Sequence, residues 1–141
     1  MPRILTLALT AAILGTAPAA LSQQPPPPAT QSTAQTEAMR GLREAESELR
    51  DALKRIEDGT LSASSAMSRL RQALNEVERA MLRLPADARR GAPWQTAVKE
   101  VAEAMTAVRE DAGDLAAARA AAGEAVATLP ALAGAESGTG G

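Results

Sequence analysis

The stretch that decides the fold is SASSAMSRLRQALNEVERAMLRL, residues 62–84. Its apolar side chains recur at alternating spacings of four and three, which places them on one face of an α-helix. These side chains are Ala63, Met67, Leu70, Leu74, Val77, Met81 and Leu84. Thr60 or Ser62 can cap the helix start, and Pro85 ends the helix because its ring cannot continue the backbone bonding. The sequence therefore predicts a helix over residues 62–84.

A second apolar stripe precedes this one. Leu42, Leu49 and Ile56 repeat every seven residues, and Ala38, Ala45 and Ala52 flank them. Residues 32–35, Ser-Thr-Ala-Gln, have the form of a capping box, and Gly59 supplies a left-handed helix end. We expect a helix over residues 34–58, antiparallel to the next one because the turn between them is short.

A third stripe begins after Pro93, which suits the first position of a helix. It comprises Trp94, Val98, Val101, Met105, Val108, Ala112 and Leu115, and it runs on through Ala118, Ala122, Val126 and Leu129. The expected fold is all-α, an antiparallel three-helix bundle with helices at about 34–58, 62–84 and 93–128. The third helix would be about 55 Å long and would overhang its partners, either continuous or kinked near Gly113 or Gly123. A short fourth helix, starting after the pair Gly113 and Asp114, is the alternative. The bundle domain would span residues 34–130, because Pro130 ends the helical pattern.

The N-terminal segment has the form of an export signal. Arg3 precedes an apolar run of about 11 residues, followed by the small-residue site Ala17-Pro18-Ala19. The run is shorter than the roughly 20 residues that span a bilayer. We expect a signal peptide over residues 1–19, with cleavage as late as residue 22, and a periplasmic or secreted protein with no membrane span after cleavage. A disordered Pro/Gln-rich linker over residues 20–33 and a disordered tail over residues 131–141 complete the domain plan.

The residue types argue against an enzyme. The chain has no cysteine and no histidine, so it offers neither a disulfide nor the usual base for a serine or cysteine nucleophile. Lys54 and Lys99, the two lysines, stand among charged neighbours, and the carboxylates alternate with arginines as on a solvated helix face. The methionines on or beside the apolar stripes are typical of gap-filling core; they are Met39, Met67, Met81 and Met105. We expect no catalytic residue, no cofactor and no metal.

With catalysis argued against, binding is the remaining class of function. Loss of Arg3 with the signal changes the formal net charge from −2 to −3, which gives no general attraction to nucleic acid. The leading hypothesis is an exported, non-enzymatic bundle that binds an envelope protein or associates with itself. Trp94, Arg83, Arg89 and Arg90 are the candidate partner-binding residues. The alternative is a periplasmic carrier or chaperone-like protein that opens its core to apolar ligands or unfolded chains.

Overall fold

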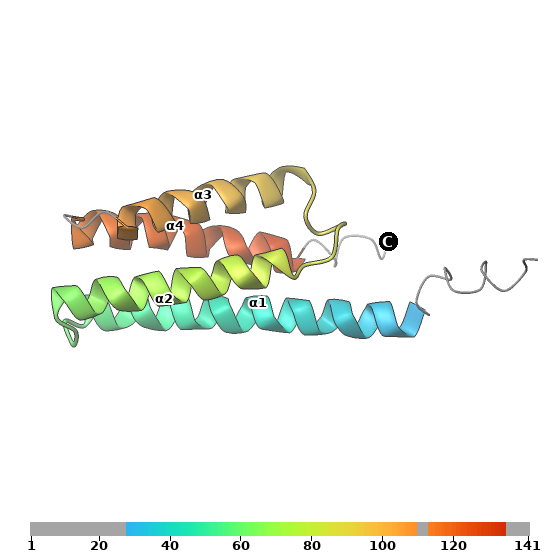
Figure 1. Cartoon of the computed structure of the whole chain (residues 1–141), viewed down its shortest axis with the longest axis horizontal. Coiled ribbons are helices and arrows are strands. Elements are labelled where there is room, and N and C mark those ends of the chain that lie inside the picture. Colours follow the sequence, from blue (N-terminus) through green and yellow to red (C-terminus); the bar gives the residue numbers. More distant parts are fainter. Residues whose placement is uncertain (1–27, 110–112, 135–141) are drawn as a thin grey trace, which may run out of the picture.

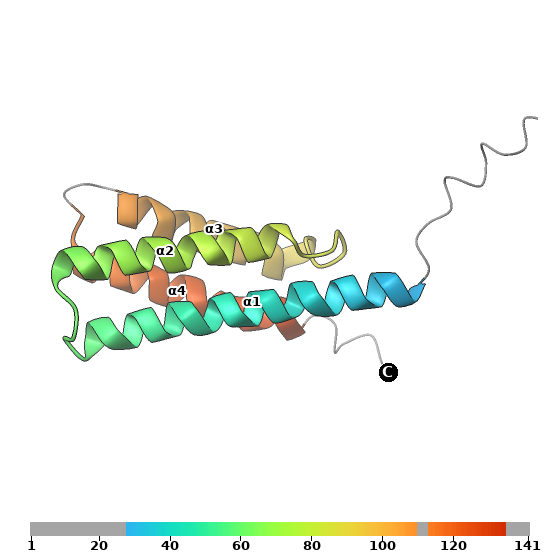
Figure 2. The ribbon, with the colours of Figure 1, turned by 60° about the horizontal axis from the view of Figure 1, so that its bottom comes forward.

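The computed structural model describes residues 28–109 and 113–134, with side chains from Thr33 onward. Four α-helices make up these residues: α1 (Pro28–Glu57), α2 (Ala63–Leu82), α3 (Gly91–Arg109) and α4 (Leu115–Gly134). α1 and α2 form one antiparallel hairpin, and α3 and α4 form a second hairpin that packs against the first (Figure 1, and turned by 60° in Figure 2). The expected signal peptide at residues 1–19 lies outside the described residues.

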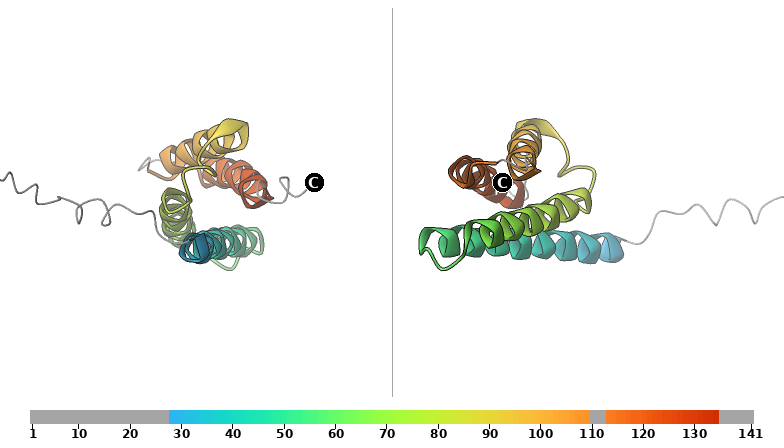
Figure 3. Two further views of the ribbon diagram at one scale, coloured as in Figure 1. Left: turned by 90° about the vertical axis from the view of Figure 1, so that its right-hand side faces the viewer. Right: turned by 60° about the vertical axis from the view of Figure 1, so that its left-hand side comes forward.

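The two hairpins close into a bundle, as the end-on view of Figure 3 shows. α2 and α4 each pack against all three other helices, whereas α1 and α3 do not pack against each other in the described part of the chain. α2 and α4 therefore form the central pair. Several of the positions that these two helices bury are alanines, whose short side chains permit dense packing; these are Ala66, Ala73, Ala80, Ala118, Ala122 and Ala125.

The turn between α1 and α2 follows from three residues. Gly59 adopts φ +67°, the left-handed conformation that glycine reaches without steric cost. The amide of Thr60 donates to the Arg55 carbonyl at 3.2 Å, which closes the helix end. Of the two caps that the sequence offered for α2, Ser62 is the one used, because its hydroxyl accepts from the Ser65 amide at 3.3 Å.

The core contains aliphatic and methionine side chains, and no polar or charged side chain of the described residues is buried. Most of the predicted stripe positions are buried, including Leu42, Leu49, Leu70 and Leu74. Val98 is an exception at 41% exposed, and its neighbour Ala97 is fully buried instead. The buried face of α3 overlaps the predicted one, since Val101, Met105 and Val108 are buried as expected, but it includes Ala97 and Ala104 and leaves out Val98.

The prediction of a three-helix bundle is wrong, because the expected third helix is two helices. α3 ends at Arg109, the chain reverses, and α4 runs back antiparallel from Leu115. The reversal occurs beside Gly113, one of the two proposed weak points, whereas Gly123 lies inside α4 without interrupting it. Because the chain reverses, the second half of the predicted third stripe packs inside the bundle and does not extend past its partners. Ala118, Ala122 and Leu129 of this half are fully buried.

Both helix ends at the reversal have polar partners. Arg71 of α2 donates from its guanidinium to the carbonyl of Val108, in the last turn of α3, at 2.7 Å. Asp114 caps α4: its carboxylate accepts from the Ala116 amide at 2.9 Å, and its carbonyl accepts from the Ala118 amide at 2.9 Å. The signals Gly113 and Asp114 thus mark a new helix start and not a kink.

Three further boundaries differ from expectation. α3 begins at Gly91, two residues before the predicted first position at Pro93. α1 begins at Pro28 instead of residue 34, so residues 28–33 of the predicted linker are helical and the proposed capping box lies inside the helix. Proline suits this first helical position because its missing N–H has no helical partner there. α4 continues past Pro130 to Gly134, since Leu132 is buried in the core two residues further on. Residues 20–27 and 135–141 lie outside the described residues.

We predict that Asp114→Ala lowers the free energy of unfolding by about 1 kcal/mol, because the first amides of α4 lose their acceptor. Asp114→Asn keeps an acceptor oxygen and should stay close to the parent. Urea unfolding followed by circular dichroism measures both variants. Equal losses in the two would show that the negative charge, and not the acceptor, stabilises the start of α4.

Candidate functional site

The four predicted partner-binding residues do not form one site in the structure. Arg83 is the C-cap of α2, and its backbone amide donates to the carbonyls of Ala80 and Met81. Arg89 and Arg90 are exposed in the connection to α3, where the Arg89 amide bonds the Pro85 carbonyl at 3.2 Å. Trp94 lies in the first turns of α3, half-buried and packed against the core. Of the four, only Arg83 contributes to a hollow described below.

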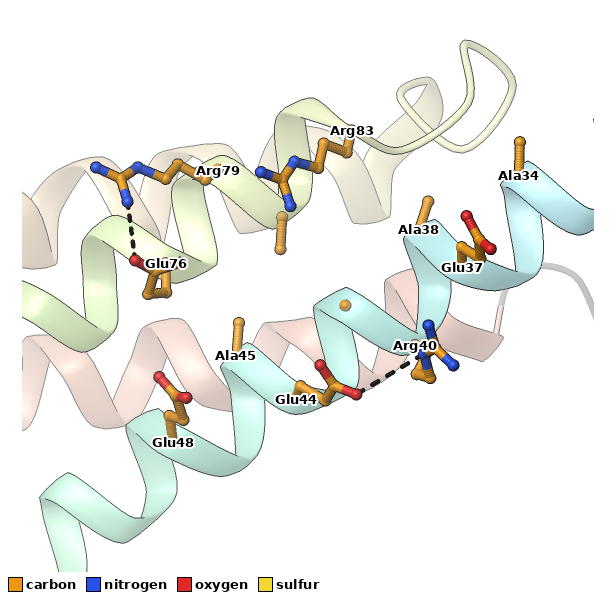
Figure 4. A pocket seen from close by; sticks show the side chains of 12 residues that line it. Ala34, Glu37, Ala38, Arg40, Glu44, Ala45, Glu48, Glu76, Arg79 and Arg83 are labelled. Atoms are coloured by element: carbon orange, nitrogen blue, oxygen red, sulfur yellow. Dashed lines mark hydrogen bonds and ion pairs between the residues drawn. The ribbon is translucent and has the colours of Figure 1, made fainter.

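A furrow runs along the hairpin of α1 and α2, and we call it the α1–α2 furrow. Its main part has a volume of about 460 Å³ and is lined by these two helices alone (Figure 4). An adjoining hollow extends it toward Pro85, and another extends it toward Arg69. The residues that line the main part are Ala34, Glu37, Ala38, Arg40, Gly41, Glu44, Ala45, Glu48, Glu76, Arg79, Ala80 and Arg83.

Small residues form the floor of the furrow. Ala38, Gly41 and Ala45 follow one another along α1 at spacings of three and four, and Ala80 faces them from α2. A Cβ atom placed on Gly41 would meet nothing within 4 Å. The furrow is therefore hollow because its floor side chains are short, and there is open space above them for a second surface.

The two walls differ in charge. The α1 wall carries the exposed carboxylates of Glu37, Glu44 and Glu48 with one arginine, Arg40, among them, and the α2 wall carries the exposed guanidinium groups of Arg79 and Arg83 beside Glu76. Figure 4 shows the two sets on opposite sides of the alanine floor. The furrow thus has one wall that is acidic on balance and one that is basic on balance, running side by side along the same length of the hairpin.

The charges are not paired across the furrow. Glu44 pairs with Arg40 of its own helix at 3.8 Å, and Arg79 pairs with Glu76 of its own helix at 2.9 Å. No described ion pair involves Glu37, Glu48 or Arg83, and the one ion pair between helices in the described residues joins Arg119 to Glu57 at 3.7 Å. Exposed pairs of this kind contribute only tenths of a kcal/mol, so the wall charges do little for the fold itself.

Outside the furrow, two lysines have pKa values shifted by their neighbours. Lys54 donates a hydrogen bond to Asp58, which raises the pKa of Lys54, and Lys99 donates to Glu100 and Glu103, which raise the pKa of Lys99. Both amines therefore stay protonated at neutral pH, which removes the lone pair that a nucleophile needs. In the described segments, no three carboxylate, thiol or imidazole side chains lie close enough to hold a metal ion. Met39, Met81 and Met105 are buried in the core, and Met67 packs against it.

Sequence reasoning identified Arg83 but did not find the furrow. The small residues at 38, 41 and 45 carry the available signal, since they keep helical spacing on a flank of the α1 stripe. Alanine is also the strongest helix former, so its recurrence alone does not distinguish a furrow from an ordinary helix face. Only the packing of α1 on α2 places Ala80 and the two arginines opposite these residues.

Comparison of the chain with protein-family models, curated proteins and solved structures finds no match. The helices within residues 28–109 and 113–134 all lack the combination of length and apolarity that crossing a bilayer requires.

We predict that Trp94→Ala costs about half of the roughly 3 to 5 kcal/mol expected for a fully buried tryptophan, because the side chain is half-buried against the core. Val98→Ala, one turn along α3 and more exposed, should change stability by no more than about 0.5 kcal/mol. Denaturant unfolding of both variants tests the contrast. Equal effects would refute the packing of Trp94 on the core.

Proposed function

We propose that this chain is an exported, non-enzymatic helical-bundle protein that acts by binding a protein surface in the cell envelope, in the periplasm or after secretion. The proposal combines two observations. The N-terminal sequence around residues 3–19 has the composition of an export signal. The α1–α2 furrow supplies a surface with a short-side-chain floor and oppositely charged walls.

The furrow is the observation that carries the proposal. Partners approach closely where side chains are short, and charged groups without intramolecular partners are free to pair with groups on another protein. Glu37, Glu48 and Arg83 meet this description in the furrow. A helix is the element that fits, because the furrow runs lengthwise between α1 and α2 and has room for side chains between its walls.

The carrier or chaperone-like alternative draws no comparable support. An apolar ligand requires a cavity lined by apolar side chains. The hollows among the described residues are lined largely by charged and hydroxyl side chains, and the large apolar side chains pack into the core. We therefore favour binding of a folded protein surface.

The test places a photoreactive amino acid in the full chain, produced in its native host with a C-terminal tag. One variant carries it at Glu44 in the furrow, and the control carries it at Arg43, which is exposed and lines none of the described hollows. We expect the purified protein to lack residues 1–19, or as many as 22, by mass spectrometry. We also expect irradiation to give a protein adduct from position 44 and none from position 43.

Two results would contradict the proposal. The first is a product that keeps its N-terminal residues and stays in the cytoplasm. The second is the absence of adducts from position 44 when the variant is folded and exported.

A further inference from the structure

The connection between α2 and α3 carries two arginines next to each other. It leaves the end of the bundle as an exposed loop (Figure 2). The described arginines and lysines that lie outside helices are Arg83, Arg89 and Arg90. The turn between α1 and α2, residues 58–62, contains no basic side chain. The α2–α3 connection is therefore the place where the described chain presents adjacent arginines on backbone that is not helical.

The peptide bond between Arg90 and Gly91 is open to an enzyme. The single turn in the connection ends at Arg89, whose amide donates to the Pro85 carbonyl at 3.2 Å. In the described residues, no backbone hydrogen bond engages the amide or carbonyl of Arg90 or the amide of Gly91. Both residues are exposed, and none of the ion pairs in the described ranges includes Arg90.

The competing bonds after basic residues are protected. The bond after Arg83 leads into Leu84, which is buried and whose amide bonds back to the last turn of α2. Arg109 ends α3 and is followed in the sequence by Glu110 and Asp111, which repel the carboxylate that an arginine-specific protease uses to hold its substrate. The other described basic side chains lie within helices, whose hydrogen-bonded backbone cannot extend along a protease cleft.

We propose that the Arg90–Gly91 bond is a processing site, which an arginine-specific endopeptidase of the trypsin-like class hydrolyses in the folded, exported chain. The product is a two-chain protein in which the α1–α2 and α3–α4 hairpins stay together. The inference rests on the export that the proposed function includes, and it adds a modification of the exported chain.

A protease binds several extended residues, so the segment around the bond must open locally. The first amides of a helix have no acceptor within the helix, and residues 91–93 are exposed, so opening the first turn of α3 breaks few contacts. Ala88, on the other side of the bond, is half-buried against the core, and its methyl group is a small contact to release. Local opening therefore suffices, and the core stays packed.

The reaction is the addition of water across the peptide bond. The bond between the carbonyl carbon of Arg90 and the nitrogen of Gly91 breaks. The hydroxyl goes to the Arg90 carbon, which becomes a carboxylate, and the proton goes to the Gly91 nitrogen, which becomes a new amino terminus. Water is the only co-reactant, and nothing is oxidised or reduced.

The two products share one core. α2 packs against both α3 and α4, and α4 also packs against α1. Buried side chains of all four helices belong to a single cluster, and hydrolysis breaks none of their contacts. We therefore expect the two chains to stay associated, with a melting temperature that depends on concentration because unfolding now separates them.

The test compares three forms of the full chain. The site variant is Arg89→Gln with Arg90→Gln. The control is Arg43→Gln with Arg109→Gln, which removes two exposed arginines from helices. Each purified form is treated with a low concentration of trypsin and followed by mass spectrometry and size-exclusion chromatography. The same forms, with a C-terminal tag, are also recovered from the native host.

We expect trypsin to cut the parent and the control first after Arg90, giving two fragments that elute together. The site variant should be cut about a hundredfold more slowly or worse, because its remaining basic bonds require helices to unfold. From the host, the parent and the control should yield a tagged fragment that begins at Gly91, and the site variant should yield none.

A first cut at any other bond would overturn the inference, as would fragments that separate at once. An exported parent that keeps the bond intact in its host would overturn the processing role and leave the proposed function standing. A chain retained in the cytoplasm with its N-terminal residues would contradict the proposed function, and the trypsin result would still decide which bond is open.

Discussion

The reversal between α3 and α4 is the constraint on which the rest of the bundle depends. A continuous helix through the same residues would extend far past the α1–α2 hairpin and leave half of its apolar face in water. Folding back buries Ala118, Ala122 and Leu129 within the length of that hairpin. The reversal has two stabilising contacts, the Asp114 cap on α4 and the Arg71 hydrogen bond to the end of α3. It divides the long third stripe between two helices of 19 and 20 residues, close to the 20 residues of α2.

Alanine determines how these helices meet. With a single aromatic residue and no disulfide, the chain must gain its stability from close approach of aliphatic surfaces. The buried alanines of α2 and α4 permit dense packing inside the bundle. On the outside of α1 the same residue type has another effect: it leaves the furrow hollow between the charged walls. One compositional feature thus accounts both for the dense interior and for the surface on which the proposed binding depends.

The stripes and caps were largely predictable, and the errors have physical causes. The α2 stripe could be predicted, and its cap narrowed to Thr60 or Ser62, because periodicity and local hydrogen bonding act over a few residues. Val98 could not be placed correctly, because the rotation of α3 depends on which of two adjacent faces packs better against α2 and α4. Pro130 is a strong local stop signal, yet burial of Leu132 outweighs it. In each case a contact distant in the chain prevailed over a local preference.

By itself the sequence determined that this protein is all-helical, that Thr60 or Ser62 could cap α2 and Asp114 a later helix, and that histidine and cysteine chemistry is unavailable to the chain. These conclusions depend on side-chain identity and on spacing within a few turns. The tertiary structure alone decided that there are four helices in the described residues, which face of α3 is buried, and that acidic and basic walls lie opposite each other over alanine. The reason is that the free energy of packing belongs to pairs of helices, and a pattern within one helix does not specify its neighbour or their relative heights.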